Sequence, residues 1–221
     1  MFLINPYWFV DTGGSGAAIT YEGTDARASN ATFTTQIGTA NTDRLVIFLV
    51  KTLSTSGPVE VLTVNGTSAT LIEAASKVGG NFTNISMFIK KIPSGTTATV
   101  TTDETANLET AISTYSVNCS ESEAAAALAF TSDFDEGANA LSVNLTASPD
   151  SFLIAGRIAG NGTEQSITGV ATQDYSDDIR SNEWAVAGST TSGVSGSVTV
   201  SLTDSITNHM LFAAVASLTA P

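Results

Sequence analysis

Short apolar or alternating runs, separated by Gly, Pro, Asn, Asp and Ser, fill the chain from Asn30 onward. Such runs are typical of β-strands, and the residues between them are typical of turns. Asn65-Gly66 lies between two runs and predicts a type I′ hairpin turn, because both central residues of that turn take a positive φ. The predicted strands are 31–37, 44–52, 59–64, 68–74, 84–91, 97–102, 109–117, 140–146, 151–158, 183–188, 197–203 and 209–218.

One segment has two interpretations. Ser120 followed by Glu123 fits a capping box, and the Ala-rich run 123–130 favours a short helix. Residues 125–130 also fit a buried strand, so both interpretations stay open.

A weak internal repeat connects the two parts of this pattern. TDRLVI (42–47) resembles PDSFLI (149–154), and SGTTATVT (94–101) resembles SGSVTVSL (195–202). We therefore predict an all-β fold, an antiparallel β-sandwich of jelly-roll type with two similar halves. The residues expected in its core come from the apolar strands of both halves: Val46, Phe48, Val50, Phe88, Ile112, Tyr115, Leu153 and Leu211.

The composition narrows the function classes. The chain has 33 Thr and 26 Ser among 221 residues, and Thr favours strands over helices. Eight Lys and Arg against 21 Asp and Glu give a net charge of −13. Phosphate backbones and anionic membrane surfaces would be repelled, so we expect neither a nucleic acid nor a membrane as partner. No apolar run is long enough to span a membrane, and the N-terminus lacks the basic region of a signal peptide.

Candidate catalytic groups are few. His209 is the one histidine, and no G-x-S-x-G motif accompanies it as a nucleophile. Cys119 is the one cysteine and has Glu121 and Glu123 nearby in sequence, which do not favour a reactive thiolate. A single cysteine also excludes an internal disulfide and a Cys-based zinc cluster. We expect no enzymatic activity, no cofactor and no metal centre.

Two acidic segments, predicted as loops, keep a calcium site open. Residues 133–136 read DFDE, and carboxylates recur over 174–178. Oxygen-rich loops can hold calcium, but neither segment has the spacing of an EF-hand loop. Solvated loops are the simpler interpretation.

The first ten residues are the most informative segment. Pro6, Tyr7, Trp8 and Phe9 lie in an aromatic stretch, which a Gly-rich run, DTGGSGAA (11–18), joins to the rest of the chain. Exposed apolar surface of this kind usually becomes buried against something. We divide the chain into an extended N-terminal arm with its connector (1–29) and the sandwich (30–221). The arm either covers its own sandwich as an edge strand or docks on a neighbouring protein.

Several of these stretches resemble a known group of proteins. INPYWF (4–9) followed by a Gly-rich run is similar to the start of many tailed-bacteriophage virion proteins. IGTANTDRLV (37–46), VNGTSATL (64–71) and IPSGT (92–96) are similar to a β-sandwich domain of phage structural proteins. The resemblance covers most of residues 1–118 and concerns turns and strands, without catalytic residues to carry over.

The resemblance implies an accessory structural protein of the virion, made in the bacterial cytoplasm. We expect in first place a capsid decoration (cement) protein that binds the major capsid protein or another virion protein. A homo-oligomer, with a trimer favoured, fits this role. A tail or fibre component that binds a host-surface glycan is the alternative, and a polysaccharide-degrading enzyme on the same fold is a third.

Overall fold

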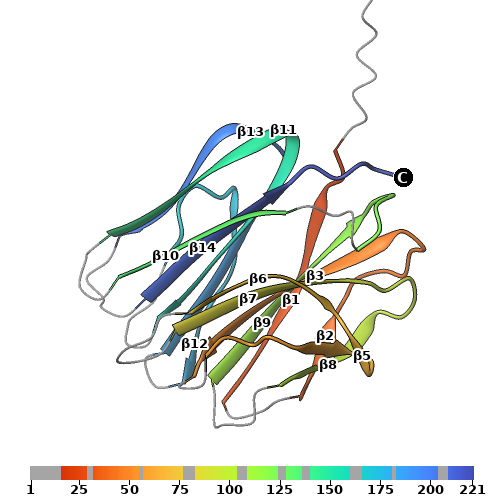
Figure 1. Ribbon diagram of the computed structural model, residues 1–221, viewed down its shortest axis with the longest axis horizontal. Helices are drawn as coiled ribbons and strands as arrows, with labels where there is room; N and C mark the ends of the chain where they lie inside the picture. The colour runs from red at the N-terminus through yellow and green to blue at the C-terminus, as the bar shows by residue number, and fades with distance from the viewer. Residues whose placement is uncertain are drawn as a thin grey trace, which may run out of the picture.

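The computed structural model describes residues 16–28, 32–54, 57–76, 83–103, 109–123, 128–135, 140–159, 166–180, 183–203 and 209–221. These residues form fourteen β-strands and no helix, and all strand pairs are antiparallel. The protein is therefore an all-β sandwich (Figure 1). The arm residues Pro6, Tyr7, Trp8 and Phe9 lie outside the described residues.

The strands form three sheets. The outer sheet has the order β2 (Thr32–Gln36), β8 (Thr97–Thr102), β4 (Leu62–Val64) and β5 (Thr67–Ser68). The first central sheet has the order β1 (Ile19–Ala28), β9 (Glu109–Asn118), β3 (Arg44–Leu53), β7 (Thr83–Lys91) and β6 (Thr70–Ser76). The second central sheet has the order β10 (Ala129–Asp135), β14 (His209–Ala216), β11 (Ala140–Ala159), β13 (Glu183–Thr203) and β12 (Thr172–Arg180).

The two longest strands extend beyond the second central sheet. Residues 140–147 of β11 pair with residues 196–203 of β13 as a two-stranded ribbon. The pairing register shifts between Ala147 and Ser151, and positive φ angles at Asp150 (59°) and Gly193 (76°) accompany the bend. Apolar side chains of the ribbon, such as Leu141, pack on the far face of the second central sheet. The ribbon thus covers that sheet as the outer sheet covers the first.

The core consists of three apolar clusters between these layers. Leu45, Ile47 and Leu49 of β3 point toward the second central sheet, whereas Val46 and Phe48 point toward the outer sheet. Because both faces of β3 are covered, its sequence is almost continuously apolar and every residue in it is buried. All eight predicted core residues are buried, which confirms that prediction.

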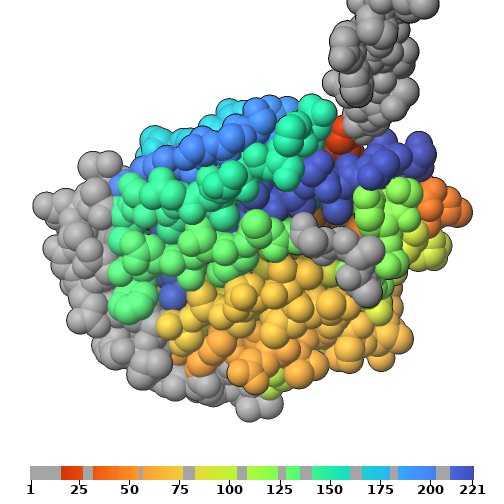
Figure 2. Space-filling view, turned by 45° about the horizontal axis from the view of Figure 1, so that its top comes forward, coloured from red at the N-terminus to blue at the C-terminus, as the bar shows by residue number. Residues whose placement is uncertain are grey.

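The two central sheets pack face to face. Figure 2 shows this arrangement from outside, with β11 and β13 (green to blue) in the upper part, residues before 80 (yellow and orange) in the lower part, and β10 (green) at their boundary. Phe152 and Ile154 of β11 meet Leu45 and Ile47 of β3 in the central cluster. The body thus has four layers.

Several sequence expectations differ from the structure. Residues Ile19–Ala28, assigned above to the connector, form β1 and pair with β9. The second acidic segment lies in β12, and residues 133–135 of the first lie in β10, so these residues are strands rather than loops. The strand interpretation holds for Ala129 and Phe130, whereas residues 124–127 lie outside the described part. The Asn65-Gly66 turn is confirmed, with φ angles of 50° and 79°.

Candidate functional site

A polar groove opens between the edge strands β1 and β2, where the first central sheet and the outer sheet diverge. Two adjoining hollows, of about 400 and 230 Å³, form it and share Gln36. Hydroxyl, amide and carboxylate side chains line both hollows. The lining residues are Thr20, Glu22, Gly23, Thr24, Asp25, Thr34, Thr35, Gln36, Gly38, Thr39, Thr96, Ser116 and Asn118.

A bulge in β1 sets the direction of the side chains on that wall. The register against β9 shifts between Tyr21 and Gly23, so Tyr21 pairs with Tyr115 and Gly23 pairs with Thr114. Gly23 has a φ of 149°, a conformation that other residues rarely adopt. As a result Glu22 points into the groove, while Tyr21 contacts the central cluster.

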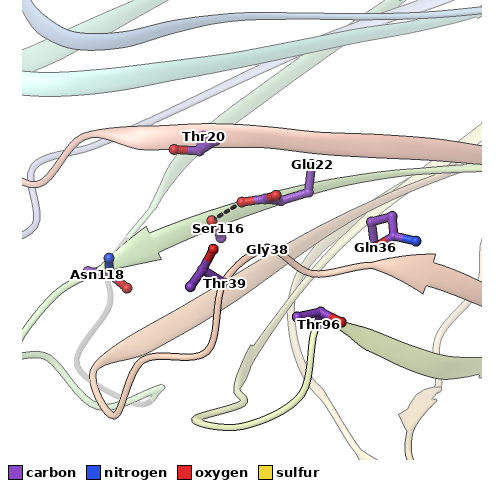
Figure 3. A pocket seen from close by; sticks show the side chains of 8 residues that line it. All are labelled: Thr20, Glu22, Gln36, Gly38, Thr39, Thr96, Ser116 and Asn118. Carbon is purple, nitrogen blue, oxygen red and sulfur yellow. Dashed lines mark hydrogen bonds between the residues drawn. The ribbon is translucent and has the colours of Figure 1, made fainter.

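Glu22 is the central group of the larger hollow. Its carboxylate accepts a hydrogen bond from the Ser116 hydroxyl on β9 (Figure 3). Gly38 has a φ of 77°, and a Cβ atom there would collide with the Glu22 carboxylate. The glycine therefore allows the loop after β2 to approach Glu22 closely.

Arg44 fixes the loops around this hollow. Its wholly buried guanidinium donates hydrogen bonds to the backbone oxygens of Gly38 (2.7 Å), Ile92 (2.8 Å), Ser94 (3.0 Å) and Gly95 (3.0 Å). Two loops that are distant in sequence are thereby held together at the groove. The groove has a defined shape because these loops share one cation.

The groove lining is rich in hydrogen-bonding side chains. Its hydroxyls and amides can donate and accept hydrogen bonds, as a polyhydroxylated ligand requires. Among the residues that the structure describes, the groove lining contains no histidine, cysteine or lysine. Over the described ranges, no three His, Cys, Asp or Glu side chains gather as metal ligands.

Cys119 and Asp174 are not among the residues that line the groove. Cys119 is buried, and burial raises the pKa of its thiol to about 11. Asp174 in β12 accepts a hydrogen bond from the Tyr115 hydroxyl (3.0 Å), and so belongs to a contact between the central sheets. His209 begins β14. Within the described residues, no helix is long and apolar enough to cross a membrane.

Comparisons with known proteins add little to this geometry. No protein-family model and no curated protein matches the chain. Among solved structures, it is similar to a conserved protein of unknown function from Pseudomonas aeruginosa PAO1. The identity is 13%, the match covers 91% of this chain and 81% of the other, and the TM-score is 0.34.

No sequence motif marks the groove. Its lining residues are mostly Thr, Ser, Gln and Asn, which are abundant throughout the chain and stand out nowhere. A usable signal was the run ITYEGTDARA, in which Thr and aromatic residues support a strand while Gly marks a bulge.

Proposed function

We propose that the chain is a non-enzymatic accessory structural protein of a tailed-bacteriophage particle, in first place a capsid decoration protein on the outer shell. The observation that carries the proposal is the place where the N-terminal segment joins the body. Gly16 bridges Thr219, and the Ala17 amide donates to the Leu218 carbonyl (2.7 Å). The chain therefore enters the described body at Gly16, at one end and beside the C-terminal residues (Figure 1).

In this proposal, each half of the chain forms a jelly roll. In the first half, β1-β9-β3-β7 faces β2-β8-β4-β5, and the second half has the order β10-β14-β11-β13. The ribbon takes the place of the outer sheet in the second half, and Thr168 bridges Ser201 at its edge. Jelly rolls are common among viral capsid and lectin domains, and this supports the proposal.

The sequence repeat supports the same duplication. The paired motifs at 94–101 and 195–202 both lead into strands that cover a central sheet, namely β8 and the end of β13. Gly95 and Gly196 occupy the same motif position and have similar φ angles of 78° and 71°. The motifs at 42–47 and 149–154 both lead into a strand next to the last strand of their half.

In this proposal the arm residues Pro6, Tyr7, Trp8 and Phe9 dock on the major capsid protein or on another virion protein. Burying three aromatic side chains would contribute on the order of 5–10 kcal/mol before ordering costs. The protein is a homo-oligomer, with a trimer favoured. The net charge of −13 suits an outward-facing, soluble surface.

The test compares three forms of the protein: full length, a deletion of residues 1–12, and the full-length triple variant Tyr7→Ser, Trp8→Ser, Phe9→Ser. Each is measured for its thermal midpoint and for its binding to particles that lack it. We expect both altered forms to keep the midpoint and to lose binding. Binding at full affinity without the arm would refute the docking role, and a collapsed midpoint would show that the arm belongs to the body.

A tail or fibre component that binds a host-surface glycan is the second candidate, and the polar groove favours it. Gln36 lines both hollows, whereas Thr32 on the same strand lines neither. If the groove binds glycans, Gln36→Ala should weaken binding to host-surface polysaccharide and Thr32→Ala should not. Equal binding by both variants and the wild type would remove this candidate.

A further inference from the structure

Lys51 on β3 lies between the two central sheets with no exposed surface. Its neighbours on the same face of β3 are Leu49 and Leu53, both members of the central apolar cluster. A charged amine in such surroundings loses its hydration, which is unfavourable unless other groups replace the water. The contacts of this side chain therefore determine its charge.

The amine of Lys51 has uncharged hydrogen-bond partners. Its Nζ donates to the Ser113 Oγ (2.7 Å) on β9 and to the Val186 carbonyl (3.4 Å) on β13. The second contact crosses from one central sheet to the other. A chain of hydroxyls continues from Ser113 to the Thr24 Oγ1 (2.7 Å) and from there to the Tyr21 hydroxyl (2.8 Å).

A second set of polar groups faces the amine from β12. The Tyr175 ring centre lies 5.5 Å from Nζ, and Asp174 accepts the hydrogen bond from Tyr115. Asp174 also bonds Ser189 of β13, so its carboxylate is occupied by two hydroxyls. The titratable groups near this site are Tyr21 and Asp25 on β1, Glu109 and Tyr115 on β9, and Asp174, Tyr175 and Asp177 on β12.

These surroundings determine the protonation of each group. Burial lowers the pKa of Lys51 from 10.5 to about 7, and the Asp174 charge only partly opposes this shift. Burial raises the pKa of Tyr115 well above its usual value and that of Tyr175 to about 12, so both stay protonated near neutrality. Burial also raises the pKa of Asp174. Lys51 therefore changes its charge near neutral pH while the tyrosines around it do not.

We propose that Lys51 and its hydroxyl partners form a proton-sensitive contact between the two central sheets, in which protonation of the amine weakens their packing. A neutral amine needs few acceptors, and Ser113 with Val186 satisfies it. An ammonium group has three donors and a full charge, and these two acceptors do not replace its water. This inference does not depend on the proposed function.

The direction of the pH dependence follows from linkage. Between the pKa of about 7 in the folded protein and about 10.4 in the unfolded chain, the unfolded state binds one more proton. Stability therefore rises with pH across this window and falls as the pH drops toward 7. Below about 7 both states carry the proton, and Lys51 adds no further change.

The test measures denaturant unfolding between pH 7.5 and 9.5 for the wild type, Lys51→Met and Lys91→Met. Lys91 is a matched control, because it lies on β7 of the same sheet with a partly exposed side chain. For each unit by which the pH rises, the unfolding constants of the wild type and of the control should fall about tenfold relative to that of Lys51→Met. Equal slopes for all three proteins would overturn the proposal.

A second measurement covers the case in which Lys51→Met does not fold. With ¹³C-labelled lysine in the wild-type protein, the Cε resonances are titrated by NMR. One lysine, Lys51, should titrate with a midpoint near 7. If no lysine in the folded protein titrated near 7, the Lys51 amine would be hydrated and the proposal would be wrong.

Discussion

Gly156 provides a test of how the two central sheets pack. It lies on β11 directly opposite Phe212 of β14, on the face turned toward the first central sheet. A Cβ atom at this position would collide with the Phe212 ring and lie 2.7 Å from a methyl carbon of Leu49 on β3. The glycine is therefore required by close approach, since its φ is not positive.

The substitution Gly156→Ala sets two effects against each other. Alanine restricts the unfolded chain and would stabilise by about 0.4–1 kcal/mol where space allows. Overpacking a well-filled core costs about 1–3 kcal/mol. Steric overlap with two side chains from two sheets should outweigh the entropy gain, with a net loss of about 1–2 kcal/mol and a thermal midpoint lower by about 2–8 °C.

A double-mutant cycle shows whether Leu49 is responsible. Leu49→Ala alone should destabilise by about 2–5 kcal/mol, because it removes a large buried side chain. Combined with Gly156→Ala, it provides room for the added methyl group. The double mutant should therefore lose less stability than the sum of the two single-mutant losses, by at least ~0.5 kcal/mol. Urea unfolding of the four proteins measures the cycle. Strict additivity, or a stabilising Gly156→Ala, would refute the face-to-face packing described here.

Three further predictions concern single residues. Arg44→Met should cost about 3–5 kcal/mol in urea unfolding, since it leaves four backbone carbonyls without their donor; a loss below about 1 kcal/mol would contradict this. Cys119 should resist iodoacetamide at pH 8 in the folded protein and react after unfolding, as mass spectrometry would show, because the thiol is buried and its pKa is about 11. Gly66→Ala should lower the free energy of unfolding by about 1–2 kcal/mol, because a φ of 79° strains any residue with a Cβ atom. An unchanged urea midpoint would contradict this.

The central strands could be predicted from the sequence because burial on two faces leaves a continuous apolar run. β3, β7 and β9 lie within a residue of their predicted bounds, and the apolar side chains of β3 match the core prediction. Thr32–Gln36 was also recognisable, since its buried Phe33 and Thr35 alternate with exposed residues.

The edge strands β1 and β12 could not be predicted, because little of their sequence is continuously apolar. β12 reads TQDYSDDIR, and its outer residues are solvated carboxylates that resemble a loop. β1 carries a glycine bulge that interrupts the alternation. The groove was not predictable either. It lies beside β1, whose bulge hides the strand pattern, and it is lined by residue types found everywhere in the chain. Lys51 was missed because one lysine at the end of an apolar run gives no sign of full burial.

The strand order has a consequence for synthesis on the ribosome. The first central sheet uses only residues up to Asn118, so it can form while the rest of the chain is still being made. The second central sheet has β14 in its interior, between β10 and β11, and needs the chain up to Ala216. At typical elongation rates the remaining ~100 residues take roughly 5–20 s. During that time the apolar face with Leu45, Ile47 and Leu49 has no partner, and it would be a natural binding site for a nascent-chain chaperone.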